Sequence, residues 1–134
     1  MVTREQIDSF FASPAFGVVG ASTDRNKYGN KVLRCYLQNG KRAIPVHPSE
    51  TIVEGVATVP NVSALPDEVK SISVITPPRI TEQIVIEAIS KGITSIWMQP
   101  GAESAAAINS CQAAGINVIA DGSCLLVVLG YRDH

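Results

Sequence analysis

Short apolar runs alternate along the chain with longer segments in which apolar residues recur every three or four positions. The apolar runs predict buried strands at residues 15–19, 42–46, 71–75, 95–98 and 117–120. The longer segments predict helices just after Thr3 and over residues 29–39, 81–91 and 103–114, the second with an apolar stripe of Val32, Leu33, Tyr36 and Leu37. Residues 49–70 show no clear periodicity apart from a short strand at residues 52–53, and residues 125–129 form an apolar tail.

This alternation of strands and helices predicts an α/β fold. Apolar strands separated by helices indicate a parallel sheet that is covered on both faces. Right-handed crossovers then give a single doubly wound, Rossmann-like sheet of about five to six strands with helices on both faces. No linker or low-complexity stretch interrupts the pattern, so we expect residues 1–134 to form a single domain.

Composition narrows the function classes without identifying one. The chain is 46% hydrophobic and 17% charged, and its 11 basic and 12 acidic residues give a net charge of −1. Without a basic excess we expect no nucleic-acid partner, and without a long apolar stretch or signal-peptide pattern we expect no membrane partner and a cytoplasmic location. The three cysteines have no C-x-x-C spacing and are expected to be reduced thiols, and no pattern of metal-ligand spacing predicts a metal site.

The first predicted strand ends abruptly at Gly20, and a polar loop leads into a helix that begins near Gly29. This layout is typical of a phosphate site, where backbone N–H groups and a helix N-terminus face an anion. The loop lacks the dinucleotide spacing G-x-G-x-x-G, because the next glycine after Gly20 is nine residues on. The sequence therefore favours a nucleotide site over a typical NAD site.

The end of the second predicted strand also disfavours dinucleotides. NAD sites place an acidic residue there for the ribose hydroxyls, whereas this chain has Val46-His47-Pro48-Ser49, with Glu50 as the first acid. Arg42, which an NADP site could use, lies at the opposite end of the strand.

In a parallel sheet all loops from strand to helix lie at one edge. Here these loops are rich in glycine, proline and small polar residues, and they cover residues 20–29, 46–49, 76–79, 99–101 and 121–124. Such a stiff and mostly uncharged rim suits an adenine nucleotide with an apolar extension.

Four segments occur in an order and spacing that resemble a known family: Val18–Ser22, Tyr36–Gln38, Ile44–Pro48 and Trp97–Gly101. Over about residues 8–126 the chain resembles the stand-alone CoA-binding domain proteins, which are related to the CoA-binding domain of the succinyl-CoA synthetase alpha subunit. The resemblance implies that coenzyme A is the ligand. It implies no catalytic step, because the synthetase's phosphohistidine domain and an ATP-grasp domain have no counterpart in this sequence.

The resemblance also assigns roles to individual residues. It implies that Gly20, Ala21 and Ser22 hold the CoA diphosphate and that Lys27 and Arg79 can pair with phosphate. His47 either bonds a phosphate or ribose or caps the strand end. The predicted ligand-binding set is Gly20, Ala21, Ser22, Lys27, Tyr28, Gly29, Val46, His47, Pro48, Thr76, Pro77, Pro78 and Arg79.

Other functions stay open beside the binding of CoA or an acyl-CoA without catalysis. An NAD(P)-binding oxidoreductase-like enzyme would need a general acid or base at the loop edge, where His47, Asp121 and Cys124 qualify. Cys124 alone would serve a thiol-dependent acyl carrier. A regulatory protein would use CoA as a signal and a protein partner as its target. The apolar tail at residues 125–129 would either form a self-association surface, giving a homo-oligomer, or cap the core of the sheet. Cys35 and Cys111 fall within predicted helices and are expected to be buried.

Overall fold

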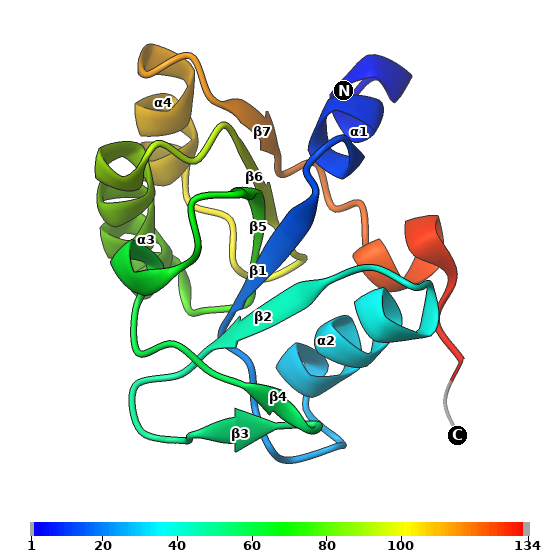
Figure 1. The fold of residues 1–134 in the computed structure, drawn as a ribbon. Helices are drawn as coiled ribbons and strands as arrows, with labels where there is room; N and C mark the ends of the chain where they lie inside the picture. The colour runs from blue at the N-terminus through cyan, green and yellow to red at the C-terminus, as the bar shows by residue number, and fades with distance from the viewer. Residues whose placement is uncertain (1, 133–134) are drawn as a thin grey trace.

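A computed structural model describes residues 2–132 (Figure 1). Its main feature is a parallel sheet of five strands in the order β2-β1-β5-β6-β7, which confirms the predicted fold class. The strands are β1 (Ala15–Val19), β2 (Ala43–Val46), β5 (Val69–Val74), β6 (Ser95–Met98) and β7 (Asn117–Ile119). The strand order reverses between β1 and β5, which is where ligands bind in doubly wound sheets.

Helices cover both faces of the sheet (Figure 1). One face carries α1 (Arg4–Phe11), α2 (Tyr28–Gln38) and the π-helical turn η2 (Leu126–Gly130). The other carries α3 (Pro78–Lys91), α4 (Ala105–Ala113) and the 3₁₀ turn η1 (Val62–Ala64). Within residues 2–132 no helix combines the length and the apolar sequence that crossing a bilayer requires.

Alternate residues of the strands supply the two halves of the core. Phe16 of β1 and Trp97 of β6 face α1 and α2, where Phe16 stacks on Tyr36 with ring centroids 4.9 Å apart. Ile72 and Ile96 face α3 and α4 on the opposite side. The continuous apolar runs in the sequence therefore reflect burial on both faces rather than on one.

Several element boundaries differ from the sequence prediction by one to three residues, among them the starts of β5 and α3. Strand β5 begins at Val69 rather than at residue 71. Helix α3 begins at Pro78 rather than near Thr81, because proline is well suited to the first helical position, where its missing N–H has no intrahelical partner. Thr81 lies inside the first turns of that helix, where its buried hydroxyl is 2.7 Å from the Thr76 hydroxyl.

The segment predicted to be largely irregular contains a small antiparallel hairpin, β3 (Ile52–Val53) and β4 (Val56–Ala57). Its turn residues Glu54 and Gly55 both have positive φ, 50° and 77°, as a two-residue hairpin turn requires. Sequence analysis found β3 but missed β4, because glutamate is an uncommon residue for a left-handed turn position. After the hairpin, Val59 pairs with β2 and carries the chain back to the carboxyl edge of the sheet.

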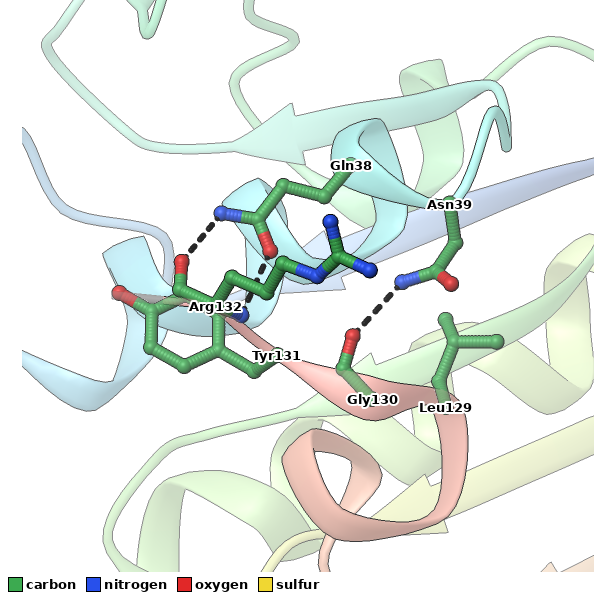
Figure 2. Close-up of a pocket in the computed structure, with 6 residues that line it drawn as sticks. All are labelled: Gln38, Asn39, Leu129, Gly130, Tyr131 and Arg132. Atoms are coloured by element: carbon green, nitrogen blue, oxygen red, sulfur yellow. Dashed lines mark hydrogen bonds between the residues drawn. The ribbon is translucent and has the colours of Figure 1, made fainter. Parts of the chain in front are cut away.

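The C-terminal segment is fixed against the far end of α2 (Figure 2). The Gln38 carboxamide donates to the Arg132 carbonyl at 2.6 Å and accepts from its N–H at 2.9 Å, while Asn39 donates to the Gly130 carbonyl at 2.9 Å. A cavity of about 450 Å³ lies among these residues. It sits at the opposite end of α2 from the loop of residues 20–29, hereafter the glycine loop. The cavity is therefore separate from the site described next.

Candidate functional site

Two neighbouring cavities open at the carboxyl edge, where β1 and β5 end. The loop cavity, of about 400 Å³, is lined by Gly20, Ala21, Ser22, Lys27, Tyr28, Gly29, His47 and Ile75. The apolar cavity, of about 440 Å³, is lined by Val19, Gly20, Ala21, Val46, His47, Pro48, Pro60, Asn61, Thr76, Ile80, Ile84 and Glu87. Because both share Gly20, Ala21 and His47, we treat them together as the edge groove.

The structure brings most of the predicted ligand-binding residues to this groove, and three lie outside its lining. Pro77 precedes α3, and Pro78 and Arg79 are its first two residues, all exposed. The groove also contains residues that sequence analysis did not select: Val19, Pro60, Asn61, Ile75, Ile80, Ile84 and Glu87.

The two glycines of the loop are required by close backbone packing. Gly20 has a φ of +97°, and a Cβ there would lie 2.1 Å from the Ile75 carbonyl oxygen at the end of β5. A Cβ on Gly29 would lie 2.0 Å from the Gly20 carbonyl oxygen. The first turn of α2 can therefore sit directly on the end of β1 only because both residues lack a side chain.

The N-terminus of α2 points its unpaired peptide groups toward the loop. Its N-cap is Lys27, which makes no capping hydrogen bond, and Pro77 at the start of α3 makes none either. By contrast, Thr3 caps α1 and Ser104 caps α4 through their hydroxyls. The first turn of α2 holds no acidic residue. An uncapped helix start beside a lysine favours an anion, because N–H groups and the helix dipole both present positive charge there.

Hydrogen bonds from two side chains of α2 hold the backbone of the glycine loop. Buried Asn30 donates to the Ser22 carbonyl at 2.8 Å and to the Glu54 carboxylate at 3.0 Å. Arg34, one turn further along α2, donates to Asn30 at 2.6 Å and to the Arg25 carbonyl at 2.7 Å. The hydrogen bond from Asn30, together with Arg25, lowers the pKa of the Glu54 carboxyl. These hydrogen bonds tie the loop backbone to α2 and to the hairpin turn, which restricts the movement of the loop.

His47 uses its ring nitrogen Nδ1 for a structural contact, while Nε2 has no hydrogen-bond partner among residues 2–132. Its Nδ1 accepts hydrogen bonds from the Ser49 and Glu50 backbone N–H groups at 3.1 and 2.9 Å. Because Nδ1 accepts these bonds, the ring proton is on Nε2, which makes that atom a donor. His47 thus caps the end of β2, which is one of the two roles considered from the sequence. It also lines both cavities.

The second half of the groove is mainly apolar. Val46 and Pro48 form one wall, and Ile80 and Ile84, one helical turn apart on α3, form another. The acid in this lining, Glu87, already accepts hydrogen bonds from the Ser63 N–H and hydroxyl at 2.9 and 2.8 Å. A flat apolar group can be bound here without meeting an unpaired charge.

The possible acid, base and thiol groups do not gather at one point. Cys124 is half-buried and contacts the Tyr28 hydroxyl, whose pKa is raised by burial and then by this contact, so Tyr28 is protonated near neutral pH. Asp121 is exposed, and its hydrogen bonds from Ser123 lower its pKa. Neither Asp121 nor Cys124 lines the edge groove, which His47 does.

Cys35 and Cys111 are buried, as expected from their helices. No cluster of three or more metal-ligating side chains occurs among residues 2–132.

Comparisons with known proteins show the family of the chain. Residues 15–129 match the profile of a family described as CoA binding domain. A stretch of 91 residues is 31% identical to the alpha subunit of an ADP-forming acetate–CoA ligase, isoform II, from Pyrococcus furiosus. That match covers 67% of this chain but 20% of the ligase subunit, so the chain corresponds to a small part of the relative.

Solved structures of similar size share the fold. A conserved hypothetical protein from Pyrococcus furiosus is 34% identical with a TM-score of 0.81, over 85% of this chain and 97% of that one. A hypothetical protein from Pyrococcus horikoshii OT3 is 26% identical with a TM-score of 0.85, over 94% of this chain and 89% of that one.

Proposed function

The chain belongs to the CoA-binding domain family, and on this premise we propose that it binds coenzyme A or an acyl-CoA in the edge groove, without catalysing a reaction of its own. The observation that carries the proposal is the uncapped start of α2 packed against the glycine loop at the point where the strand order reverses. In this proposal the loop cavity takes the diphosphate, and the apolar cavity takes the adenosine.

The loop cavity offers what a diphosphate needs. Backbone N–H groups at the start of α2 have no capping side chain, and exposed Lys27 lies beside them. The Nε2 proton of His47 supplies a further donor at the junction of the two cavities. Together these groups place positive charge and donors around an anion without an opposing carboxylate in the loop-cavity lining.

The groove also discriminates against NAD. The strand end at Val46 and His47 presents no acid to a ribose diol, and Glu87 is already bonded to Ser63. An adenosine can instead lie between Val46 and the α3 isoleucines Ile80 and Ile84. We therefore expect CoA to bind more tightly than NAD or NADP.

Calorimetric titration tests this proposal with four ligands: CoA, acetyl-CoA, NAD and NADP. We expect binding of the two CoA compounds and weaker or no binding of the dinucleotides. Lys27→Ala should weaken CoA about tenfold, because it removes a charged partner of a phosphate. The matched control is Lys70→Ala, an exposed lysine at the amino end of β5, which should leave the affinity unchanged. Tighter binding of NAD than of CoA would contradict the proposal.

The thiol-dependent acyl carrier is a second candidate, because Cys124 contacts Tyr28 and Tyr28 lines the loop cavity. Cys124 contacts a neutral phenol rather than a base, which weakens this candidate. Intact mass spectrometry after incubation with acetyl-CoA separates the two functions. An acetyl adduct that disappears in Cys124→Ala would favour the carrier, and an unmodified protein would favour binding alone.

A further inference from the structure

Gln99 directly follows β6 at the carboxyl edge and is fully buried, yet sequence analysis gave it no role. Its backbone is paired, since its N–H donates to the Val74 carbonyl at 3.1 Å and its carbonyl accepts from Ala102 at 2.9 Å. Its side-chain oxygen accepts from the Leu125 N–H at 2.9 Å and from the Tyr28 hydroxyl at 3.2 Å. The remaining polar atom of its carboxamide is the nitrogen Nε2.

The Nε2 group of Gln99 is a buried donor without a hydrogen-bond partner within residues 2–132. The orientation of the carboxamide is fixed, because the backbone N–H of Leu125 can only donate and must face the oxygen. Flipping the amide would place two donors against each other. Buried polar groups are rarely left unpaired, because each one loses its hydrogen bonds to water on folding. The two N–H bonds of Nε2 therefore call for an acceptor that residues 2–132 do not supply.

Tyr28 connects the Gln99 carboxamide, through its oxygen, to the edge groove. Tyr28 is one of the residues that line the loop cavity, and its hydroxyl reaches both Gln99 and Cys124. Tyr28 has a single proton, so when it donates to the Gln99 oxygen it accepts from the Cys124 thiol. Strand β6 lies two positions from β1 in the sheet, which puts its end about 10 Å from the glycine loop.

We propose that Nε2 of Gln99 donates a hydrogen bond to a carbonyl oxygen in the pantetheine arm, or in the thioester, of a CoA compound bound in the edge groove. The inference rests on the proposed function, because the nucleotide half must first be held at the glycine loop. From that loop the arm runs past β5 toward the end of β6. The arm is long enough for this path and carries two amide carbonyls and, in an acyl-CoA, a thioester carbonyl.

Tyr28 is the side chain that must move to admit the arm. Gln99 is closed to solvent, and Tyr28 is the half-buried neighbour that also belongs to the cavity wall. When the Tyr28 ring turns aside, its hydrogen bond to the Gln99 oxygen is lost, and that of Leu125 remains. The carboxamide then keeps its orientation while Nε2 becomes accessible.

The test compares three ligands on Gln99→Met, in which the side chain keeps its length but loses its donor and also the oxygen that accepts from Leu125 and Tyr28. The ligands are 3′-phospho-ADP (the nucleotide half of CoA), CoA and acetyl-CoA, and the matched control is Gln112→Met on the exposed side of α4. We expect the variant to bind 3′-phospho-ADP as the wild type does and to bind acetyl-CoA about five- to tenfold more weakly. An equal loss with CoA would identify an amide carbonyl as the acceptor, and a loss confined to acetyl-CoA would identify the thioester. Equal affinities of variant and wild type for all three ligands would overturn the inference.

A measurement on the wild-type protein covers the case in which Gln99→Met does not fold. In heteronuclear NMR the Gln99 carboxamide signals are recognised by their proximity to the Leu125 N–H. We expect CoA or acetyl-CoA to shift these signals more than 3′-phospho-ADP does, and equal shifts would overturn the inference. If the wild type binds none of the three ligands, the proposed function itself fails, which is a different result from either outcome above.

Discussion

Replacing Gly20 with alanine tests whether the close backbone contact between Gly20 and Ile75 holds the glycine loop in its conformation. The new Cβ would lie 2.1 Å from the Ile75 carbonyl oxygen, so one backbone segment would have to move by more than about 1 Å to restore a normal contact. Ile75 resists this movement, because its N–H donates to the Val19 carbonyl at 2.8 Å. The φ of +97° adds a second cost, since a Cβ is disfavoured in the left-handed region.

The two costs can be separated with Gly92→Ala. Gly92 has nearly the same φ, +92°, but a Cβ there would meet nothing within 4 Å. Gly92→Ala should therefore lower the free energy of unfolding by about 1–2 kcal/mol, the conformational cost alone. Gly20→Ala should lower it by a further 1–3 kcal/mol or so from overpacking, about 2–5 kcal/mol in total.

Urea-induced unfolding followed by circular dichroism measures both variants against the wild type. We also expect Gly20→Ala to weaken CoA binding, because the movement that relieves the contact displaces the loop, whereas Gly92→Ala should not. If Gly20→Ala proves no less stable than Gly92→Ala, the loop is not held by the contact with Ile75 and the reasoning is wrong.

Three further predictions concern the fold and its titratable groups. Because the fold lowers the pKa of Glu54 from its usual 4.5, the ionised carboxylate stabilises the protein above that pH and the benefit is lost as the pH falls through the lower folded-state value. The stability difference between wild type and Glu54→Gln should thus shrink between pH 6 and about pH 3 in urea titrations, and a constant difference would contradict it. Tyr36→Phe should cost about 1–3 kcal/mol, because it removes the 2.6 Å hydrogen bond to the buried Ser73 hydroxyl, and unchanged stability would refute this. Burial raises the pKa of Cys35 and of Cys111 to about 11, so a thiol reagent at pH 8 should modify only Cys124 in the native protein and all three cysteines after unfolding.

The sequence predicted the architecture well because the fold depends on local periodicity. Buried strands such as residues 15–19 and 95–98 are short continuous apolar runs, and α2 shows its apolar stripe clearly. The family resemblance is confirmed by the match over residues 15–129. Leu37 was placed in the stripe but is 36% exposed, because it lies in the last turn of α2, at the margin of the sheet.

The candidate site was predictable only in part, because much of it depends on contacts between distant segments. Gly20 and Gly29 could be selected from their positions after a strand and at a helix start. Pro60 could not, since it reaches the groove only after the chain pairs with β2 at Val59. The role of Asn30 depends on its contact with the hairpin residue Glu54, which the sequence does not show. A signal was present, because Asn30 and Arg34 are polar residues one turn apart on an otherwise apolar face of the helix.

A crystal structure of the protein with CoA tests the central claim most directly. We expect the diphosphate beside the backbone N–H groups of the glycine loop and the start of α2, with the adenosine between Val46 and the isoleucines of α3. A CoA molecule bound instead among Gln38, Asn39 and the C-terminal segment, with the edge groove empty, would contradict the account.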